Sequence, residues 1–309
     1  MVGAEAPEYS EPMNPTGAMG TAGRAWWPTS CRVCHRWQTG VLCFRCLEGA
    51  GLSALRCTRC ALRLPSPARH TFLPPDDDGL CQACRDAPPG FDHACAVLDY
   101  AEPWSSLIAS LKFQDDTAMA DVLARLMAPS LLRRWQVPGG KPASPRDTRR
   151  RQRALWKRGA PSVIVPVPLS AARLKERGYN QAWLLASQTA RELGWANRLH
   201  PHTLVRQRET GRLMAMQSDE RQRSIQNAFA VSPEQSYRVV GQHIALVDDV
   251  MTTGATANEA ARTLLAAGAA SVTGWFAART PAPAKNRSPS IKRKGQSIRP
   301  AIDTPKLAK

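Results

Sequence analysis

The most informative stretch of the chain reads Ile244-Ala-Leu-Val-Asp-Asp-Val-Met-Thr-Thr-Gly-Ala-Thr256. Its apolar start, Ile244 to Val247, predicts a buried parallel strand, and the carboxylates of Asp248 and Asp249 follow where we expect that strand to end. A loop rich in threonine comes next, followed by the helical pattern of residues 257–267. This order predicts an α/β fold with a ligand site at the end of a strand.

The loop after the acidic pair has the groups that bind a phosphorylated sugar. Its backbone N–H groups and the helix dipole attract a phosphate, and Thr252, Thr253 and Thr256 add hydroxyl donors. The carboxylates can accept hydrogen bonds from ribose hydroxyls. The loop lacks the G-x-x-x-x-G-K-[ST] pattern of a nucleotide P-loop. An ordinary acidic turn is the alternative, but paired carboxylates at a core strand end are costly without a ligand or partner.

Eight of the nine cysteines form four C-x-x-C pairs. Two such pairs complete a tetrahedral Cys₄ zinc shell with no open position, so the spacing predicts two structural zinc ions in a small N-terminal double zinc ribbon. A sequential grouping gives one ion Cys31, Cys34, Cys43 and Cys46 and the other Cys57, Cys60, Cys81 and Cys84. The spacing leaves an interleaved grouping open. His35 and His70 are alternative ligands, although surface positions are more usual, and Cys95 is predicted to be a buried core thiol.

The length and charge of the chain limit its class. Its 309 residues leave room for about two domains. No apolar segment approaches the roughly 18 residues of a membrane span. The N-terminus lacks the pattern of a secretory signal, which predicts a cytoplasmic protein. The net charge of +17 comes mainly from residues 133–158 (+9) and 281–309 (+7), so the rest of the chain is nearly neutral.

The two basic segments have two interpretations. Segments of this kind usually keep a protein soluble. The functional alternative is a salt-dependent, non-specific hold on the phosphate backbone of a nucleic acid. Trp135 and Trp156 flank the internal basic segment and are candidates for stacking on bases.

Strands and helices are expected to alternate along the rest of the chain, which predicts a doubly wound parallel sheet. Strands are expected at 94–100, 163–168, 202–205, 243–247 and 271–277. A helix is expected to start at Glu102-Pro103 with Pro103 in its first turn. Asp116 or Thr117 is expected to cap the next helix, whose apolar stripe includes Val122, Leu123, Leu126 and Met127. Residues 170–179 are expected to form a polar loop before a helix at 180–193.

Residues 31–280 resemble the ComF family, which includes the GntX-type proteins and pairs a double zinc ribbon with a type I phosphoribosyltransferase-like domain. Beside the cysteine pairs, the matching motifs are Tyr100-Ala-Glu-Pro103, Leu111-Lys-Phe113, Val165-Pro-Val-Pro-Leu169, Arg177-Gly-Tyr-Asn-Gln181, Glu220-Arg221, Ala228-Phe229 and the opening stretch from Val247 to Thr256. The resemblance implies a leader at 1–28, a ribbon at 29–92, a phosphoribosyltransferase-like domain at 93–280 with a basic insert at 133–160, and a basic tail at 281–309, with the leader and tail disordered.

The resemblance also implies roles for the site residues. Asp248 and Asp249 would hold the ribose hydroxyls of phosphoribosyl pyrophosphate (PRPP) together with Mg²⁺. The 5-phosphate would lie on Thr252, Thr253, Gly254, Ala255 and Thr256. Arg173, Lys175 and Arg177 are the candidates for the pyrophosphate-binding loop, with a solvated helix start as the alternative. Lys112 and Asp116 are candidates for the same cleft, and residues 207–223 for a mobile covering loop.

The chain departs from the family pattern in two segments. In the covering loop and just after it, Leu213, Met216 and Ser224 stand where the pattern has Gln, Leu and Asn, and Asp115 stands where the pattern has Gly. The losses of Gln and Asn remove hydrogen-bonding groups. They affect the chemistry of the loop more than phosphate binding.

Three functions fit these observations. The first is a phosphoribosyltransferase in which a nucleophile displaces pyrophosphate from PRPP. The second, also implied by the resemblance, is a non-catalytic role in natural competence, with the zinc ribbon and basic segments contacting single-stranded DNA or a DNA-uptake helicase. The third is a regulator that senses PRPP. The sequence does not decide among them, and it leaves the acceptor and the oligomeric state open.

Overall fold

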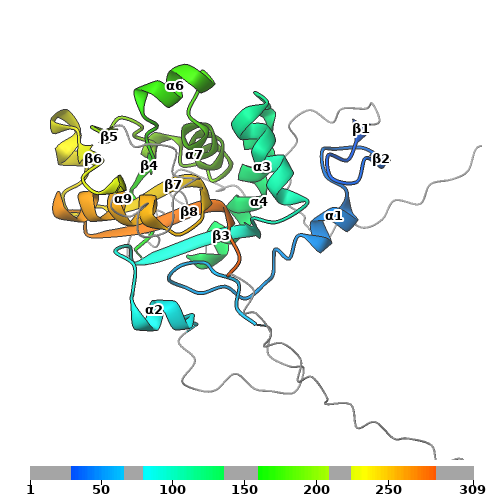
Figure 1. Cartoon of the computed structure of the whole chain (residues 1–309), viewed down its shortest axis with the longest axis horizontal. Helices are drawn as coiled ribbons and strands as arrows, with labels where there is room; N and C mark the ends of the chain where they lie inside the picture. Colours follow the sequence, from blue (N-terminus) through cyan, green and yellow to red (C-terminus); the bar gives the residue numbers. More distant parts are fainter. Residues whose placement is uncertain (1–28, 66–78, 136–158, 209–223, 283–309) are drawn as a thin grey trace, which may run out of the picture.

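A four-stranded parallel sheet forms the centre of the computed structural model, which describes residues 29–65, 79–135, 159–208 and 224–282 (Figure 1). Its strand order is β3-β8-β7-β4. The bounds of these strands are His93–Asp99 (β3), Val163–Pro166 (β4), His243–Met251 (β7) and Ser271–Arg279 (β8). The sheet confirms the predicted α/β class, and β4, which contains Pro166, is an edge strand as prolines favour.

Helices cover both faces of the sheet. Ala245 and Val247 of β7 belong to one apolar core and Ile244 and Leu246 to the other, because successive side chains of a strand point to opposite faces. The first core contains residues of α3 (Trp104–Phe113), α4 (Ala118–Arg134) and α7 (Gln181–Glu192), and the second contains residues of α9 (Ala255–Ala266). Burial on both faces explains why the strands are continuously apolar.

The remaining elements are short. Beyond the parallel sheet, β5 (Leu204–Arg206) pairs antiparallel with β6 (Phe229–Val231), and β1 (Thr29–Ser30) pairs antiparallel with β2 (Trp37–Gln38). The strand expected at 202–205 is therefore β5, shifted by a residue or two and outside the main sheet. The short helices are α1 (Phe44–Gly49), α2 (Gln82–Asp86), α6 (Ala171–Arg177), η1 (Ala196–Arg198) and η3 (Pro233–Arg238).

Several helix starts differ from the predictions. The helix α3 begins at Trp104, one residue after Pro103, so the proline precedes the first turn. Thr117 takes the N-cap position of α4 without a side-chain hydrogen bond, and Asp116 pairs with Arg32 instead. The apolar stripe of α4 is rotated from the predicted one, because Leu123 and Met127 are buried while Val122 and Leu126 are half-buried.

Residues 170–179 form the solvated helix that was the alternative interpretation, rather than a loop. They contain α6, and Ser170 caps it by accepting a hydrogen bond from the backbone N–H of Arg173 at 3.4 Å. Gly178, with a φ of 73°, then ends α6 in the left-handed conformation that glycine adopts most readily. Asn180 caps α7 in turn, so the helix predicted at 180–193 is confirmed to within a residue at each end.

The prediction for Trp135 was wrong, and the prediction for Cys95 was confirmed only in part. Trp135 is 5% exposed and packs between Trp195 and Trp275, with ring centroids 6.3 and 6.1 Å away, so it is not available to stack on bases. Cys95 is half-buried at the edge of the first core rather than fully enclosed. Burial nevertheless raises the pKa of its thiol to about 11.

Several predicted segments lie outside the described residues. These are the leader, Trp156 and most of the basic insert, His70, most of the covering loop, and nearly all of the basic tail. Within the described ranges, no helix combines the length and apolarity needed to cross a membrane.

Candidate functional site

The candidate phosphate loop connects β7 to α9. β7 is four residues longer than predicted, because its pairing with β8 continues through Asp248 to Met251. The acidic pair therefore lies inside the strand, with Asp249 buried and Asp248 half-buried. Gly254 caps α9 with a φ of 86°, a left-handed conformation that favours glycine. The strand end, the turn and the helix start thus follow one another without a gap.

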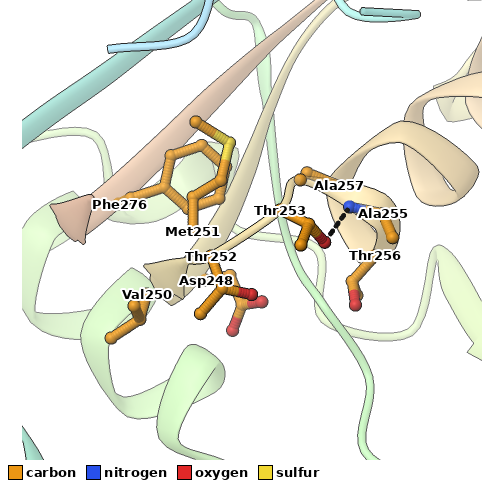
Figure 2. Close-up of a pocket in the computed structure, with 10 residues that line it drawn as sticks. Asp248, Val250, Met251, Thr252, Thr253, Ala255, Thr256, Ala257 and Phe276 are labelled. Atoms are coloured by element: carbon orange, nitrogen blue, oxygen red, sulfur yellow. Dashed lines mark hydrogen bonds between the residues drawn. The ribbon is translucent and has the colours of Figure 1, made fainter. Parts of the chain in front are cut away.

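A small pocket of about 180 Å³ lies at this turn (Figure 2). All five predicted loop residues line it together with Asp248. Figure 2 shows the Asp248 carboxylate and the Thr256 hydroxyl on one side of the loop, with Met251 and Phe276 on the other. The hydroxyl of Thr253 accepts a hydrogen bond from the backbone N–H of Ala255 at 3.4 Å. The pocket can therefore offer hydroxyls, helix N–H groups and one carboxylate to a single ligand.

Sequence reasoning missed part of the pocket wall. Val250, Met251 and Ala257 also line it, and so does Phe276, which comes from β8. Val250 and Met251 could have been found by extending the strand, whereas Ala257 belongs to α9. Phe276 required knowledge of strand pairing, because its register with Asp248 brings it to the pocket.

The second carboxylate of the pair faces a cation. Nζ of Lys112 lies 3.1 Å from Oδ1 of Asp249, and the same oxygen accepts the backbone N–H of Val250 at 2.6 Å. Burial alone would lower the pKa of Lys112, but the charges of Asp249 and Asp248 outweigh burial and raise that pKa above its ordinary value. Lys112, which was a candidate for the ligand cleft, therefore lies at the acidic pair. Asp249 is not among the residues that line the pocket.

The first carboxylate of the pair has an unusual proton affinity. Burial and the neighbouring charge of Asp249 raise the pKa of Asp248 to about 7, although Lys112 and the backbone N–H of Asp249 pull it down. This residue is thus close to half-protonated at neutral pH. A cation or a set of donated hydroxyls would stabilise the charged form, so the site is poised to gain from such a ligand.

The three pyrophosphate candidates lie on α6. Arg177 packs over the ring of Phe113 at 5.2 Å and donates to Oε1 of Gln181 at 3.1 Å. Lys175 is exposed and Arg173 is half-buried. None of the three lines the 180 Å³ pocket. The hydroxyl of Tyr179 ties the end of α6 to α3, the helix of Lys112, by donating to the carbonyl of Leu111 at 2.6 Å. The role of Arg173, Lys175 and Arg177 in pyrophosphate binding stays a prediction.

The eight paired cysteines form two separate clusters, in the sequential grouping. We call Cys31, Cys34, Cys43 and Cys46 the first cluster and Cys57, Cys60, Cys81 and Cys84 the second cluster. Within each cluster the four sulfurs lie within 4.8 Å of one another. Each cluster can therefore hold one metal ion, and the interleaved grouping is not found. His35 is exposed and belongs to neither cluster.

The geometry of both clusters fits a tetrahedral zinc ion. Zn–S bonds of about 2.3 Å place neighbouring sulfurs about 3.8 Å apart. The Sγ atoms of Cys34 and Cys43 are 3.6 Å apart, and those of Cys60 and Cys81 are 3.5 Å apart. Backbone N–H groups also point at the sulfurs: Cys57 accepts from Cys60 at 3.5 Å and from Cys81 at 3.3 Å. Such donors stabilise thiolates, the form that binds zinc.

The first cluster contacts the candidate site indirectly. Arg32, which lies between Cys31 and Cys34, pairs with Asp116 at 2.9 Å. Asp116 follows α3 four residues after Lys112. Asp116 was a candidate for the ligand cleft, but its carboxylate is instead committed to the ribbon. The resulting contact joins the ribbon to the loop between α3 and α4.

The chain is similar to curated bacterial proteins that are named as DNA utilization or competence proteins. It is 32% identical over 241 residues to the DNA utilization protein YhgH of Escherichia coli K12, covering 77% of this chain and 90% of that protein. It is 31% identical over 226 residues to the competence protein F of Haemophilus influenzae, covering 72% and 84%. A 114-residue region is 36% identical to the competence protein ComFC of Bacillus subtilis, covering 37% and 42%. No protein-family model matches the chain.

Proposed function

This chain belongs to the ComF family, and from that premise we propose that its α/β domain binds PRPP with Mg²⁺ in the pocket between β7 and α9. The observation that carries this proposal is the meeting of three kinds of group at one pocket. They are the Asp248 carboxylate, the hydroxyls of the threonine-rich turn and the start of a twelve-residue helix. A phosphorylated ribose presents a matching anion, a set of hydroxyls and a place for a divalent cation.

Each side of the pocket then has a role. The turn from Thr252 to Thr256 and the N–H groups at the start of α9 hold the 5-phosphate. Asp248 accepts from the ribose hydroxyls or binds Mg²⁺, for which a carboxylate oxygen is a preferred ligand. Lys112 holds Asp249 in place at 3.1 Å and balances the charge of the acidic pair. The cations of α6 are assigned to the pyrophosphate end of the ligand.

A transfer reaction at this site would need no covalent residue. A nucleophile would bond to C1 of the ribose while the bond from C1 to the pyrophosphate oxygen breaks, and the electron pair would leave with the pyrophosphate. The protein would contribute orientation and stabilisation of the leaving charge. Binding without turnover, as in a sensor of PRPP, requires the same pocket.

We also propose that the protein takes part in the handling of DNA during natural competence. The names of the relatives support this role, since they are competence and DNA utilization proteins. The surface of the segment that carries the first cluster adds a physical reason. The side chains of Trp37 and Phe44 are 74% and 59% exposed, and each has an exposed arginine beside it in the sequence. Exposed aromatic rings beside cations are suited to stacking on the bases of single strands.

Calorimetric titration of the zinc-loaded protein with PRPP and Mg²⁺ tests the pocket. We expect binding in the wild type and a loss of at least about tenfold in affinity in Asp248→Asn, because a neutral amide cannot balance Mg²⁺. Asp121→Asn is the matched control, since Asp121 pairs with Arg125 on α4 and does not line the pocket. Absence of wild-type binding, or equal binding by Asp248→Asn, would overturn the proposal.

Two further measurements separate the candidate functions. Release of pyrophosphate from bound PRPP in the presence of an acceptor indicates transfer, whereas binding without release indicates a sensor or an accessory protein. Affinity for single-stranded DNA is measured for the wild type and Trp37→Ala at physiological salt. The DNA role of the ribbon is supported by a severalfold loss in Trp37→Ala and contradicted by unchanged affinity.

A further inference from the structure

Three residues form a row across the carboxyl edge of the sheet. Arg279, the last residue of β8, is in register with Asp99 of β3 on one side and with Met251 of β7 on the other. Carboxyl ends of parallel strands meet at one edge, so this row lies directly beneath the turn that begins at Thr252. The residue at the centre of the row, Arg279, is a long cation with five N–H donors.

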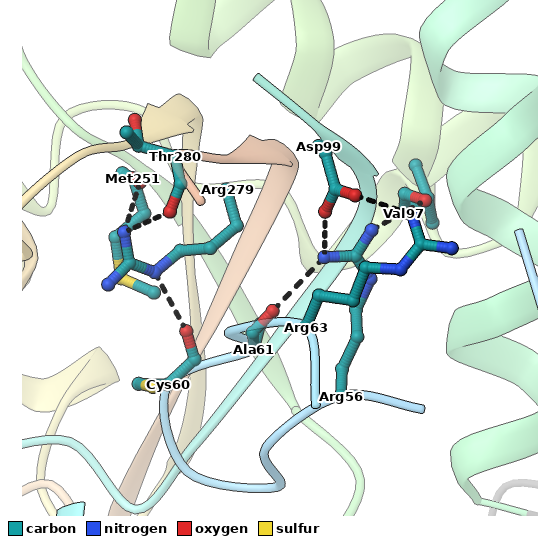
Figure 3. Close-up of polar contacts among 9 residues, drawn as sticks. All are labelled: Arg56, Cys60, Ala61, Arg63, Val97, Asp99, Met251, Arg279 and Thr280. Carbon is teal, nitrogen blue, oxygen red and sulfur yellow. Dashed lines mark hydrogen bonds and ion pairs between the residues drawn. The ribbon is translucent and has the colours of Figure 1, made fainter. Parts of the chain in front are cut away.

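Arg279 lies between the second cluster and the start of the phosphate loop, and Figure 3 shows its contacts with Cys60, Met251 and Thr280. Its Nε donates to the carbonyl of Cys60, a member of the second cluster, at 3.1 Å. Its Nη1 donates to the carbonyl of Met251 at 3.0 Å and also to the carbonyls of Thr252 and Thr280. One guanidinium therefore connects a cysteine of the second cluster to the last residue of β7 and the first residue of the loop.

The neighbouring strand end anchors the same part of the ribbon. The Asp99 carboxylate pairs with Arg56 at 2.8 Å and with Arg63 at 2.7 Å. Arg56, which is largely buried, also donates to the carbonyl of Ala61 at 3.2 Å. Figure 3 shows these contacts beside those of Arg279. The segment that carries Cys57 and Cys60 is thus attached to the sheet edge at two adjacent strand ends.

We propose that Arg279 is a positioning residue through which the second cluster and the phosphate loop control each other. This inference rests on the proposed PRPP site and adds its regulation: occupancy of the second cluster by metal strengthens phosphate binding, and a bound phosphate strengthens metal retention. The first cluster contacts Asp116 instead, through Arg32, so the coupling belongs to the second cluster.

Peptide geometry explains the effect on the loop. In a trans peptide unit the N–H of one residue points opposite to the carbonyl of the residue before it. Arg279 binds the carbonyls of Met251 and Thr252, so the N–H groups of Thr252 and Thr253 are turned away from Arg279. The backbone N–H of Thr280 also holds the Met251 carbonyl, at 3.0 Å, so the Thr252 carbonyl is the one that depends on Arg279. Holding it fixes the direction of the Thr253 N–H, which can donate to a phosphate, and the nearby positive charge adds to the attraction for an anion.

Metal binding explains the dependence on the second cluster. The carbonyl of Cys60 has a defined place only while the turn from Cys57 to Cys60 is folded, and small zinc modules fold with their metal. Loss of the ion would free the Cys60 carbonyl, and Nε of Arg279 would then lose its partner. Thermodynamic linkage then requires that a phosphate ligand that binds the ordered loop more tightly also favours the metal-bound form of the second cluster.

Hydrogen exchange of the zinc-loaded protein tests the connection directly. We expect the amides of residues 252–256 to exchange about tenfold faster in Arg279→Gln than in the wild type, because charge-assisted hydrogen bonds to the loop are lost. Arg63→Gln is the matched control, since it removes the same charge and a contact to Asp99 but no contact to the loop. Equal exchange in the two variants would overturn the inference.

The effect on binding is measured in the same variants. PRPP with Mg²⁺ should bind about tenfold more weakly to Arg279→Gln, and Arg279→Lys should not restore it, because an ammonium lacks the planar fork that reaches both carbonyl groups. PRPP should also slow release of zinc from the second cluster to a chelator in the wild type, but not in Arg279→Gln. Wild-type affinity in Arg279→Gln would contradict the positioning role. If the wild type bound no PRPP while loop exchange still responded to Arg279→Gln, the proposed function would fail and the connection would stand.

Discussion

Asp248 lies among groups that change its proton affinity in opposite directions. Burial and Asp249 raise its pKa to about 7, while Lys112 opposes them. Ribose hydroxyls and Mg²⁺ both require the charged carboxylate, so binding must expel the proton wherever the free protein still holds it. We expect the affinity for PRPP with Mg²⁺ to rise with pH up to about 7 and then to level off, once the ionisation of the ligand is subtracted.

Proton release measures this linkage. Calorimetry in buffers of different ionisation enthalpy should detect release approaching about one proton per site at pH 6 and little release at pH 8. If Asp248→Asn retains residual binding, it should release no proton from position 248. A wild-type affinity that is flat between pH 6 and 8 would show that the carboxylate is already charged in the free protein.

Lys112 makes a second prediction at the scale of single residues. Lys112→Met leaves the buried carboxylate of Asp249 without its cation, and breaking one side of a buried pair costs roughly 3–5 kcal/mol of unfolding free energy. Arg125→Met is the control, because its pairs with Asp121 and Glu192 are both more than one third exposed and should each contribute less than about 1 kcal/mol. The free energy of unfolding of both variants is measured with urea.

The pKa of Lys112 is raised, so its contribution to the free energy of unfolding is fully present below about pH 10 and is lost as the pH rises beyond its folded pKa. Equal losses in the two variants at pH 7 would contradict a special role for Lys112.

At the scale of elements, local pattern predicted the existence of the main strands and helices better than their ends. The apolar runs of β7 and β8 and the stripe of α3 were legible because burial on both faces, or on one stripe, determines residue type. The end of β7 was misplaced because two aspartates normally mark the end of a strand, whereas pairing with β8 carries the strand on to Met251. α6 was only the alternative interpretation of its segment because none of its residues is buried, so it shows no apolar stripe.

The candidate site was predictable where its residues are consecutive. The threonine-rich turn and the acidic pair could be identified from one stretch of sequence, but Phe276 and Arg279 reach the site only through the pairing of β8. The Trp135 prediction failed for a similar reason, since only the packing of α4 against β8 and Trp195 shows that its ring is enclosed. Contacts between distant segments are what a local pattern does not contain.

The central strand β8 supplies a test at this scale. A Cβ added at Gly274 would lie 2.5 Å from the ring of Phe276, which is buried and lines the pocket. Gly274→Ala must therefore displace that ring, and we expect it to cost about 1–3 kcal/mol of unfolding free energy and to weaken PRPP binding. Gly90→Ala, whose added Cβ would meet only ordinary contacts beyond 3.5 Å, should cost under about 0.5 kcal/mol. If thermal unfolding found Gly274→Ala as stable as the wild type, the ring of Phe276 would have room to move.

At the scale of the whole molecule, the two cysteine clusters are attached to different parts of one sheet domain. The first reaches the loop after α3 through Arg32, and the second reaches the ends of β3 and β8 through Arg56, Arg63 and Arg279. The ribbon is therefore more than an appended module, because Arg279 donates hydrogen bonds both to Cys60 in its second half and to the start of the loop that forms the candidate site. Residues 31–84 bring all eight ligands, and residues 93–279 bring the sheet that receives them.

The grouping of the cysteines leads to a prediction for the intact protein. Native mass spectrometry should find two zinc ions per chain. Cys46→Ser and Cys84→Ser should each lose one ion and keep the other, because each removes a ligand from only one cluster. In an interleaved grouping, Cys31 and Cys46 would bind different ions. A double variant of these two cysteines would then affect both ions rather than one. In the sequential arrangement that double variant should retain one ion. Its sheet domain should stay folded, because the segment of the first cluster adds only Ala50, Val33, Leu42 and Leu52 at the edge of a core built mainly from the sheet and its helices. Loss of both ions from Cys31→Ser/Cys46→Ser would contradict the two independent clusters seen here.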